Sequence, residues 1–131
     1  MPPLPRILIV DDNLDHRLIL TYQLARIQPF EIREAEDGQQ ALAVLATAPP
    51  DLIFMNLGLP LLDGWEVIRR IRVLAPPLGQ VPIIAYTAYA GGQEEQQARQ
   101  AGCDEYLVKP VLNRGVLQQT VASLLARGLR P

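Results

Sequence analysis

Short apolar runs alternate along this chain with longer segments that have helical periodicity. Five of the runs have the length of strands: 6–10, 30–35, 51–56, 81–86 and 106–108. The first run, Arg6-Ile-Leu-Ile-Val10, is β-branched and unbroken, which is typical of a strand buried on both faces. The second run alternates apolar and polar residues, so we expect an edge strand with one wetted side.

Between these runs, apolar residues recur at the spacing of an α-helix. We expect helices over 13–28, from a cap at Asp37 to Pro49, over 64–74, over 92–101, and around Val116 to Leu125. In the first of these helices, Leu14, Leu18, Leu24 and Ala25 share one apolar side. The helix over 92–101 is the weakest of the five, because Ala98 and Ala101 are almost its only apolar anchors.

The alternation of strands and helices predicts an α/β fold with a parallel sheet. Five βα units with a polar-alternating second strand favour a doubly wound five-stranded sheet in the order 2-1-3-4-5, the flavodoxin-like (βα)5 arrangement. A length of 131 residues suits one core, so we expect residues 1–131 to form a single domain, with its core at about 6–127.

Composition narrows the class of protein. The chain is 49% hydrophobic and 20% charged, with a net charge of −2. It has no clustered basic excess, so we expect no direct binding to nucleic acid. No apolar stretch reaches the roughly 18 residues that cross a bilayer, and we expect a cytoplasmic protein without a membrane partner. The single cysteine, Cys103, excludes an internal disulfide and is expected to be a passive small residue.

Polar side chains stand at the carboxyl ends of four of the apolar runs. Asp11 and Asp12 follow the first run, Asn56 ends the third, Thr87 follows the fourth, and Lys109 follows the fifth. In doubly wound sheets, binding sites form at this edge, where the chain direction around the sheet reverses. Two adjacent carboxylates and a third oxygen ligand suit Mg²⁺. Asp11-Asp12 alone would indicate a turn and a helix cap, but Thr87 and Lys109 favour a site.

This assembly resembles the phosphorylation site of a response-regulator receiver domain in two-component signalling. The resemblance runs from about Arg6 to Arg127, and its combined motifs are specific. Further matches are Ala35-Glu-Asp-Gly38, Asp63-Gly64, the small Ala88 after Thr87, and the step Lys109-Pro110, where a cis peptide is common.

The resemblance implies a role for each site residue. Asp12 would ligate Mg²⁺ directly and Asp11 mainly through water, with the side chain at position 56 and the backbone carbonyl of Gly58 as further ligands. In the family, an aspartate at the position of Asn56 takes a phosphoryl group from a phosphohistidine. In the family, a lysine and the metal offset the charge of the phosphoryl group. The resemblance assigns the role of that lysine to Lys109.

The resemblance also implies a switch. The hydroxyl of Thr87 would move towards the phosphoryl group, and Tyr106 would follow it and change the surface around the fourth helix and the fifth strand. Tyr89 would border the mouth of the pocket. His16, one helical turn beyond Asp12, is expected to be an exposed helix residue and not a phosphodonor.

Asn56 departs from the family pattern at its centre. An amide nitrogen is a poor nucleophile because its lone pair is delocalised, so Asn56 should form no stable acyl phosphate. Its carbonyl oxygen can still face a metal or Lys109. Losing one of three carboxylates should weaken Mg²⁺ binding and stabilise the metal-free protein. Two histories fit the amide: a receiver that diverged to work without phosphorylation, or a substitution that locks the unphosphorylated state.

We therefore expect a receiver module of phosphorelay signal transduction, with a histidine kinase or phosphotransfer protein as partner and no turnover of an external substrate. A homodimer through the fourth helix, fifth strand and last helix is possible. The alternative is a phosphorylation-independent pseudo-receiver that acts as a protein–protein interaction module. A flavodoxin-like cofactor carrier is disfavoured, because Asp11-Asp12 would repel a phosphate where such proteins cradle one.

Overall fold

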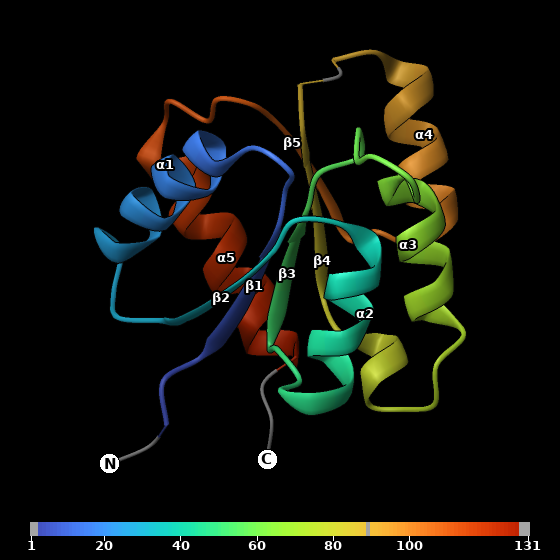
Figure 1. Cartoon of the computed structure of the whole chain (residues 1–131). Coiled ribbons are helices and arrows are strands. Elements are labelled where there is room, and N and C mark those ends of the chain that lie inside the picture. Colours follow the sequence, from blue (N-terminus) through green and yellow to red (C-terminus); the bar gives the residue numbers. More distant parts are fainter. Residues whose placement is uncertain (1–2, 89, 129–131) are drawn as a thin grey trace.

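A five-stranded parallel sheet forms the centre of the computed structural model, which describes residues 3–88 and 90–128 (Figure 1). Its strands are β1 (Arg6–Val10), β2 (Glu31–Ala35), β3 (Leu52–Met55), β4 (Ile83–Thr87) and β5 (Glu105–Val108). The strand order is β2-β1-β3-β4-β5, which confirms the predicted order and places β2 at an edge. Tyr89 lies outside the described residues.

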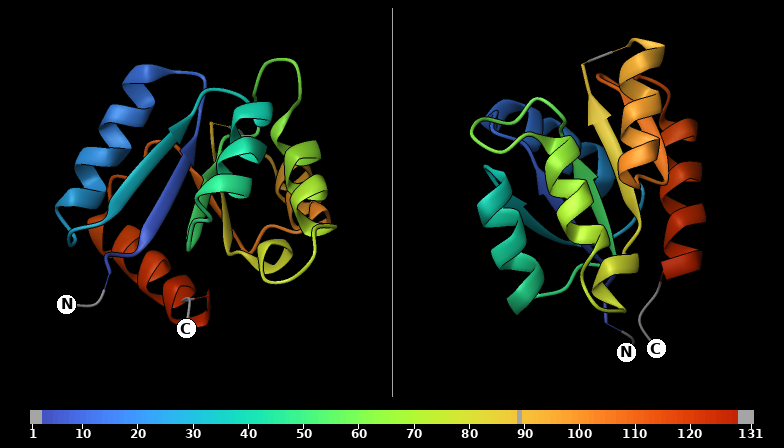
Figure 2. Two further views of the ribbon diagram at one scale, coloured as in Figure 1. Left: turned by 60° about the horizontal axis from the view of Figure 1, so that its bottom comes forward. Right: turned by 90° about the vertical axis from the view of Figure 1, so that its right-hand side faces the viewer.

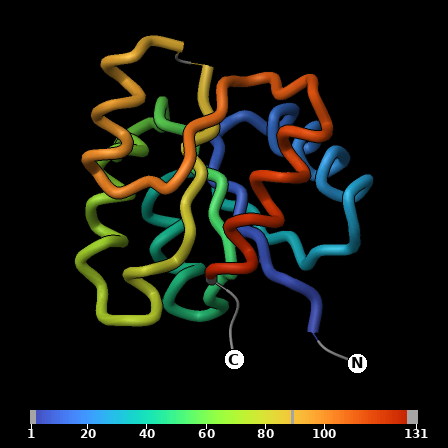
Figure 3. Tube along the Cα trace, turned by 180° about the vertical axis from the view of Figure 1, so that it is seen from behind, coloured from blue at the N-terminus to red at the C-terminus, as the bar shows by residue number. Residues whose placement is uncertain are grey.

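Helices cover both faces of the sheet (Figure 2). They are α1 (Leu14–Ala25), α2 (Gly38–Thr47), α3 (Gly64–Arg72), α4 (Gly92–Ala101) and α5 (Arg114–Gly128), with a short 3₁₀ turn, η1 (Leu78–Gln80), before β4. Helices α1 and α5 pack on one face, where they lie beside each other when the molecule is seen from behind (Figure 3). Helices α2, α3 and α4 pack on the other face.

Each face of the sheet contributes its own apolar cluster. Ile7, Ile9 and Phe54 point towards α1 and α5, where they pack in one cluster with Leu20 and Leu124. Alternate strand residues point the other way, towards α2, α3 and α4. Because the central strands are buried on both faces, their sequences read as unbroken apolar runs.

The buried side of α1 differs from the predicted one. Leu14 and Leu18 are each 55% exposed, whereas the helix buries Leu20, Leu24 and the charged Arg17. The predicted stripe was therefore wrong except at Leu24, and Ala25 is also exposed. The physical reason is that Arg17 donates hydrogen bonds to groups at the ends of β1 and β2, which turns its side of the helix inwards.

Side-chain caps fix where four helices begin. Asn13, Asp37, Asp63 and Asn113 accept hydrogen bonds from the backbone N–H three residues later, as N-caps do. Gly64 follows the third cap at a close crossing, where a Cβ atom would lie 2.3 Å from the backbone oxygen of Asn56. Glycine is required there, which explains the Asp63-Gly64 motif.

Helix α4 buries few side chains, as its sequence predicts. Its buried residues are Ala98 and Ala101, and Trp65 at the start of α3 donates from Nε1 to the backbone oxygen of Glu94, at 3.4 Å. Among the described residues, no helix combines the length and the apolar character that a membrane crossing needs.

Candidate functional site

The residues predicted for the site line one pocket of about 230 Å³ at the carboxyl edge of the sheet. Its lining comprises Asp11, Asp12, Asn13, His16, Asn56, Gly58, Thr87, Ala88 and Lys109. Tyr106 does not line this pocket. The pocket lies over β1 and β3, where the order of a doubly wound sheet reverses.

Backbone hydrogen bonds hold these residues in register just beyond the strand ends. The amide of Asp11 donates to the carbonyl of Ala35, and the amide of Asn56 donates to the carbonyl of Val10, at 3.0 and 2.9 Å. The amide of Lys109 donates to the carbonyl of Thr87 at 2.7 Å. The parallel ladder thus continues for one residue past β1, β3 and β5, and it fixes the backbone from which Asp11, Asn56 and Lys109 project.

Asp11 is the most enclosed charged group of the pocket. Its carboxylate contacts the ammonium of Lys109 and accepts a hydrogen bond of 2.9 Å from the backbone N–H of Asn13. Its side chain is 4% exposed and that of Lys109 is 10% exposed, so the pair is shielded from solvent. The ion pair keeps the negative charge of Asp11 matched within the pocket.

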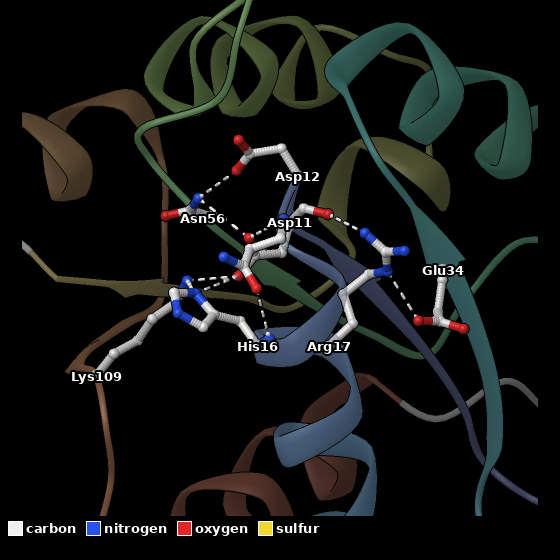
Figure 4. A network of polar contacts seen from close by, with 8 residues as sticks. Asp11, Asp12, His16, Arg17, Glu34, Asn56 and Lys109 are labelled. Carbon is white, nitrogen blue, oxygen red and sulfur yellow. Dashed lines mark hydrogen bonds and ion pairs between the residues drawn. The ribbon is translucent and has the colours of Figure 1, made fainter.

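The amide of Asn56 faces both aspartates (Figure 4). Its nitrogen Nδ2 lies 3.5 Å from Oδ1 of Asp11 and 3.4 Å from Oδ1 of Asp12. An amide N–H beside two carboxylates lowers their mutual repulsion, whereas an aspartate at this position would add a third negative charge. Lys109 offsets one of the two negative charges, and the amide gives both carboxylates a hydrogen-bond donor.

The donor set fits a hard divalent cation once the amide turns. Among the described residues, no three His, Cys, Asp or Glu side chains gather closely enough to hold a metal. Asp11 and Asp12 therefore need neutral oxygen ligands, and the carbonyls of Asn56 and Gly58 are the ones at hand. A half-turn of the Asn56 side-chain amide would present its oxygen in place of its nitrogen.

His16 is a pocket residue that the sequence prediction missed. Its side chain is 47% exposed, as expected for a helix surface, but its Nδ1 lies 3.2 Å from Nζ of Lys109 and 3.7 Å from Oδ2 of Asp11. Its position four residues after Asp12 was the available signal, because one helical turn returns a side chain to the same side of the helix.

The predicted switch residues lie on one face of the sheet. In the β4–β5 register, Ala85 pairs with Tyr106 and Thr87 pairs with Val108, so Thr87 and Tyr106 point to the same side. Thr87 is 1% exposed, and Tyr106 is half-buried against the cluster that faces α4. The peptide bond between Lys109 and Pro110 is cis, as the resemblance suggested.

Comparison with known proteins places the chain in a family. Residues 7–122 match the response regulator receiver domain, so the chain belongs to this family of signalling modules, which are not classical enzymes. It is 36% identical over 127 residues to the transcriptional regulatory protein AfsQ1 of Streptomyces coelicolor, a match that covers 97% of this chain and 54% of that protein. The chain spans about half the length of the first curated relatives it matches.

Solved structures that resemble this chain support its place in the receiver family. A putative response regulator from Chloroflexus aurantiacus shares 31% identity, with a TM-score of 0.86 over 96% of this chain and all of that chain (100%). The receiver domain of the sensor histidine kinase PA1611 from Pseudomonas aeruginosa shares 32% identity, with a TM-score of 0.82 over 95% of this chain and 99% of that chain. That structure has a magnesium ion coordinated in its active-site cleft.

Proposed function

We propose that this chain is a phosphorelay receiver whose pocket is complete except for its phosphoacceptor, so that in the Asn56 form it cannot be phosphorylated. Residues 6–127 act as one module that docks on a histidine kinase or phosphotransfer protein. With aspartate at position 56, the module would catalyse its own phosphorylation. Asp11, Asp12 and Gly58 would hold the metal, Lys109 would offset phosphoryl charge, and Thr87 would respond to it.

The contacts of Asn56 carry this proposal. Its Nδ2 atom faces the two carboxylates that would hold the metal, at 3.4 and 3.5 Å, so position 56 presents a hydrogen-bond donor and no nucleophilic oxygen anion. An amide at this position leaves the lysine, the hydroxyl and the acidic pair in place. The pocket therefore lacks one function, attack on phosphorus, and keeps the others.

Magnesium is the metal that we propose for this pocket. Two carboxylates with carbonyl and water oxygens suit Mg²⁺, and a related receiver domain holds that ion in its active-site cleft. Asn56 weakens the site in two ways. It removes one negative charge, and its N–H groups must give up the two aspartates before a cation can enter.

Exposed apolar side chains beside the pocket suit the docking of a phosphodonor. Leu14 and Leu18 on α1 are each 55% exposed, and Leu112 in the β5–α5 connection is 87% exposed. A helical phosphotransfer partner that lay across these residues would bring its histidine to the mouth of the pocket. Dimerisation through α4, β5 and α5 stays a prediction, and sedimentation would test it. The absence of direct nucleic-acid binding also stays a prediction.

Beryllofluoride binding tests the proposal, because this phosphoryl analogue needs the aspartate oxygen, the metal and the lysine together. In ¹⁹F NMR with Mg²⁺, we expect a bound beryllofluoride signal for Asn56→Asp and none for the Asn56 chain. A bound signal in the Asn56 chain would contradict the stated role of the amide. No signal in either protein would contradict the proposal that the remainder of the pocket is competent.

The pseudo-receiver alternative has one observation in its favour. Asn56 and Lys109 together give both aspartates a polar partner without a metal, so the acidic pair can serve as a structural element. In that case, the chain would act through its docking surface alone. Failure of Asn56→Asp to accept any phosphoryl analogue would favour this alternative.

A further inference from the structure

The single histidine and the single lysine of the chain meet at the pocket. Nδ1 of His16 lies 3.2 Å from Nζ of Lys109 (Figure 4). His16 comes from α1 and Lys109 from the end of β5, 93 residues later in the chain. Every other basic side chain is an arginine, so this contact pairs two residue types that the chain uses nowhere else.

The hydrogen bond between Lys109 and His16 has a defined donor and acceptor. An ammonium group has three N–H donors and no acceptor, so Lys109 donates and Nδ1 of His16 accepts. The imidazole is therefore neutral in this contact, with its proton on Nε2. Asp11 accepts a second ammonium hydrogen. Two of the three ammonium hydrogens are then used, and the third remains for a further acceptor.

A neutral acceptor suits this position better than a charged one. A second carboxylate beside Nζ, in addition to that of Asp11, would hold the ammonium but would also offset more of the positive charge that a phosphoryl group needs. The imidazole supplies a hydrogen bond without adding negative charge to a pocket that already holds Asp11 and Asp12. The His16 side chain is 47% exposed, so this acceptor lies at the border between the pocket and solvent.

We propose that His16 is a positioning residue for Lys109: it holds the ammonium group at the mouth of the pocket, with one N–H directed to the place of the phosphoryl group. The catalytic part of this inference rests on the proposed function. The positioning part concerns only Lys109 and is testable in the Asn56 chain as it stands.

Hydrogen exchange of the Lys109 ammonium tests the positioning directly. Labelling with ¹⁵N-lysine gives one ammonium signal, because Lys109 is the only lysine. At about pH 8, His16→Leu should speed ammonium exchange at least roughly threefold. His16→Asn should restore slow exchange, because its side-chain oxygen takes the approximate place of Nδ1. Equal exchange in the parent and in His16→Leu would overturn the inference.

Phosphorylation kinetics test the consequence in the Asn56→Asp background. With Mg²⁺ and acetyl phosphate, adding His16→Leu should lower the labelling rate about tenfold, and His16→Asn should recover most of that loss. Equal rates with histidine and leucine at position 16 would overturn the catalytic part. If Asn56→Asp with His16 intact is never labelled, the proposed function fails, and ammonium exchange alone decides the role of His16.

Discussion

Arg17 of α1 donates a hydrogen bond of 2.8 Å to the backbone carbonyl of Asp11, at the point where β1 passes into the pocket. The guanidinium also donates to Glu34 at 2.8 Å, and the Arg17 side chain is only 8% exposed. This buried contact joins the first helix to the acidic loop. It also explains why α1 turns a charged residue inwards and leaves leucines outside.

Replacing Arg17 should therefore destabilise the protein more than replacing an exposed arginine does. In Arg17→Met, the buried carbonyl of Asp11 loses its partner, and we expect the free energy of unfolding to fall by about 2 kcal/mol. Urea denaturation measures this loss. Arg33→Met is the matched control: Arg33 is exposed on β2, and its replacement should change stability by less than about 0.5 kcal/mol. Equal losses in both variants would contradict the stabilising role of the Arg17 contact.

Restoring an aspartate at position 56 should destabilise the metal-free protein. Asn56→Asp removes two amide contacts and places a third carboxylate beside Asp11 and Asp12. Because like charges this close repel each other, we expect a loss of roughly 1–2 kcal/mol in EDTA. Urea denaturation of the two proteins measures the difference, and equal stability in EDTA would contradict the expected repulsion.

Magnesium should make Asn56→Asp the more stable of the two proteins. The additional charge strengthens cation binding, so titration with Mg²⁺ should stabilise Asn56→Asp at lower concentrations than it stabilises the Asn56 chain. Calorimetric titration gives the two affinities directly. If the Asn56 chain binds Mg²⁺ as tightly as its aspartate variant, the proposed weakening by the amide is wrong.

Leu61 carries backbone strain in the loop between β3 and α3. Its φ angle is 66°, and its side chain is 92% exposed, so no burial offsets a conformation that leucine rarely adopts. Leu61→Asn should raise the free energy of unfolding by about 0.5–1 kcal/mol, since asparagine tolerates this region better. Leu112→Asn is the control, because Leu112 is 87% exposed without a positive φ angle. A gain at position 112 equal to that at position 61 would point to exposure and not to strain.

Cys103 should be chemically inert at neutral pH. Burial raises the pKa of its thiol to about 11, against an ordinary value of 9.0, and Arg99 offsets part of that rise. The folded state therefore holds the thiol proton more tightly, and stability from this group is lost as pH rises from about 9 through about 11. The parent should lose more stability than Cys103→Ala over that range. Rapid alkylation of the folded protein at about pH 8 would contradict this account.

Much of the fold could be predicted because its signals are local. Unbroken apolar runs indicated the central strands, and a predicted cap at Asp37 marked one helix start. The positions of Asp11, Asp12, Asn56, Thr87 and Lys109 at strand ends predicted that they would gather, and all five line one pocket.

The predictions that failed depend on partners distant in the sequence. The inward side of α1 is set by hydrogen bonds from Arg17 to groups that periodicity does not represent. His16 lines the pocket and contacts Lys109, which is 93 residues away in the chain. The spacing of four residues from Asp12 is the one local signal, and it is weak, because about half of the His16 side chain is exposed, as in a solvated helix residue.

The central claim is that one amide silences an otherwise competent phosphorylation site. Intact-mass analysis of the chain and of Asn56→Asp, each incubated with Mg²⁺ and acetyl phosphate, tests it most directly. We predict that only Asn56→Asp gains the mass of one phosphoryl group, and that Lys109→Ala in that background loses most of the gain. A phosphoryl group on the Asn56 chain, or none on Asn56→Asp, would contradict the claim.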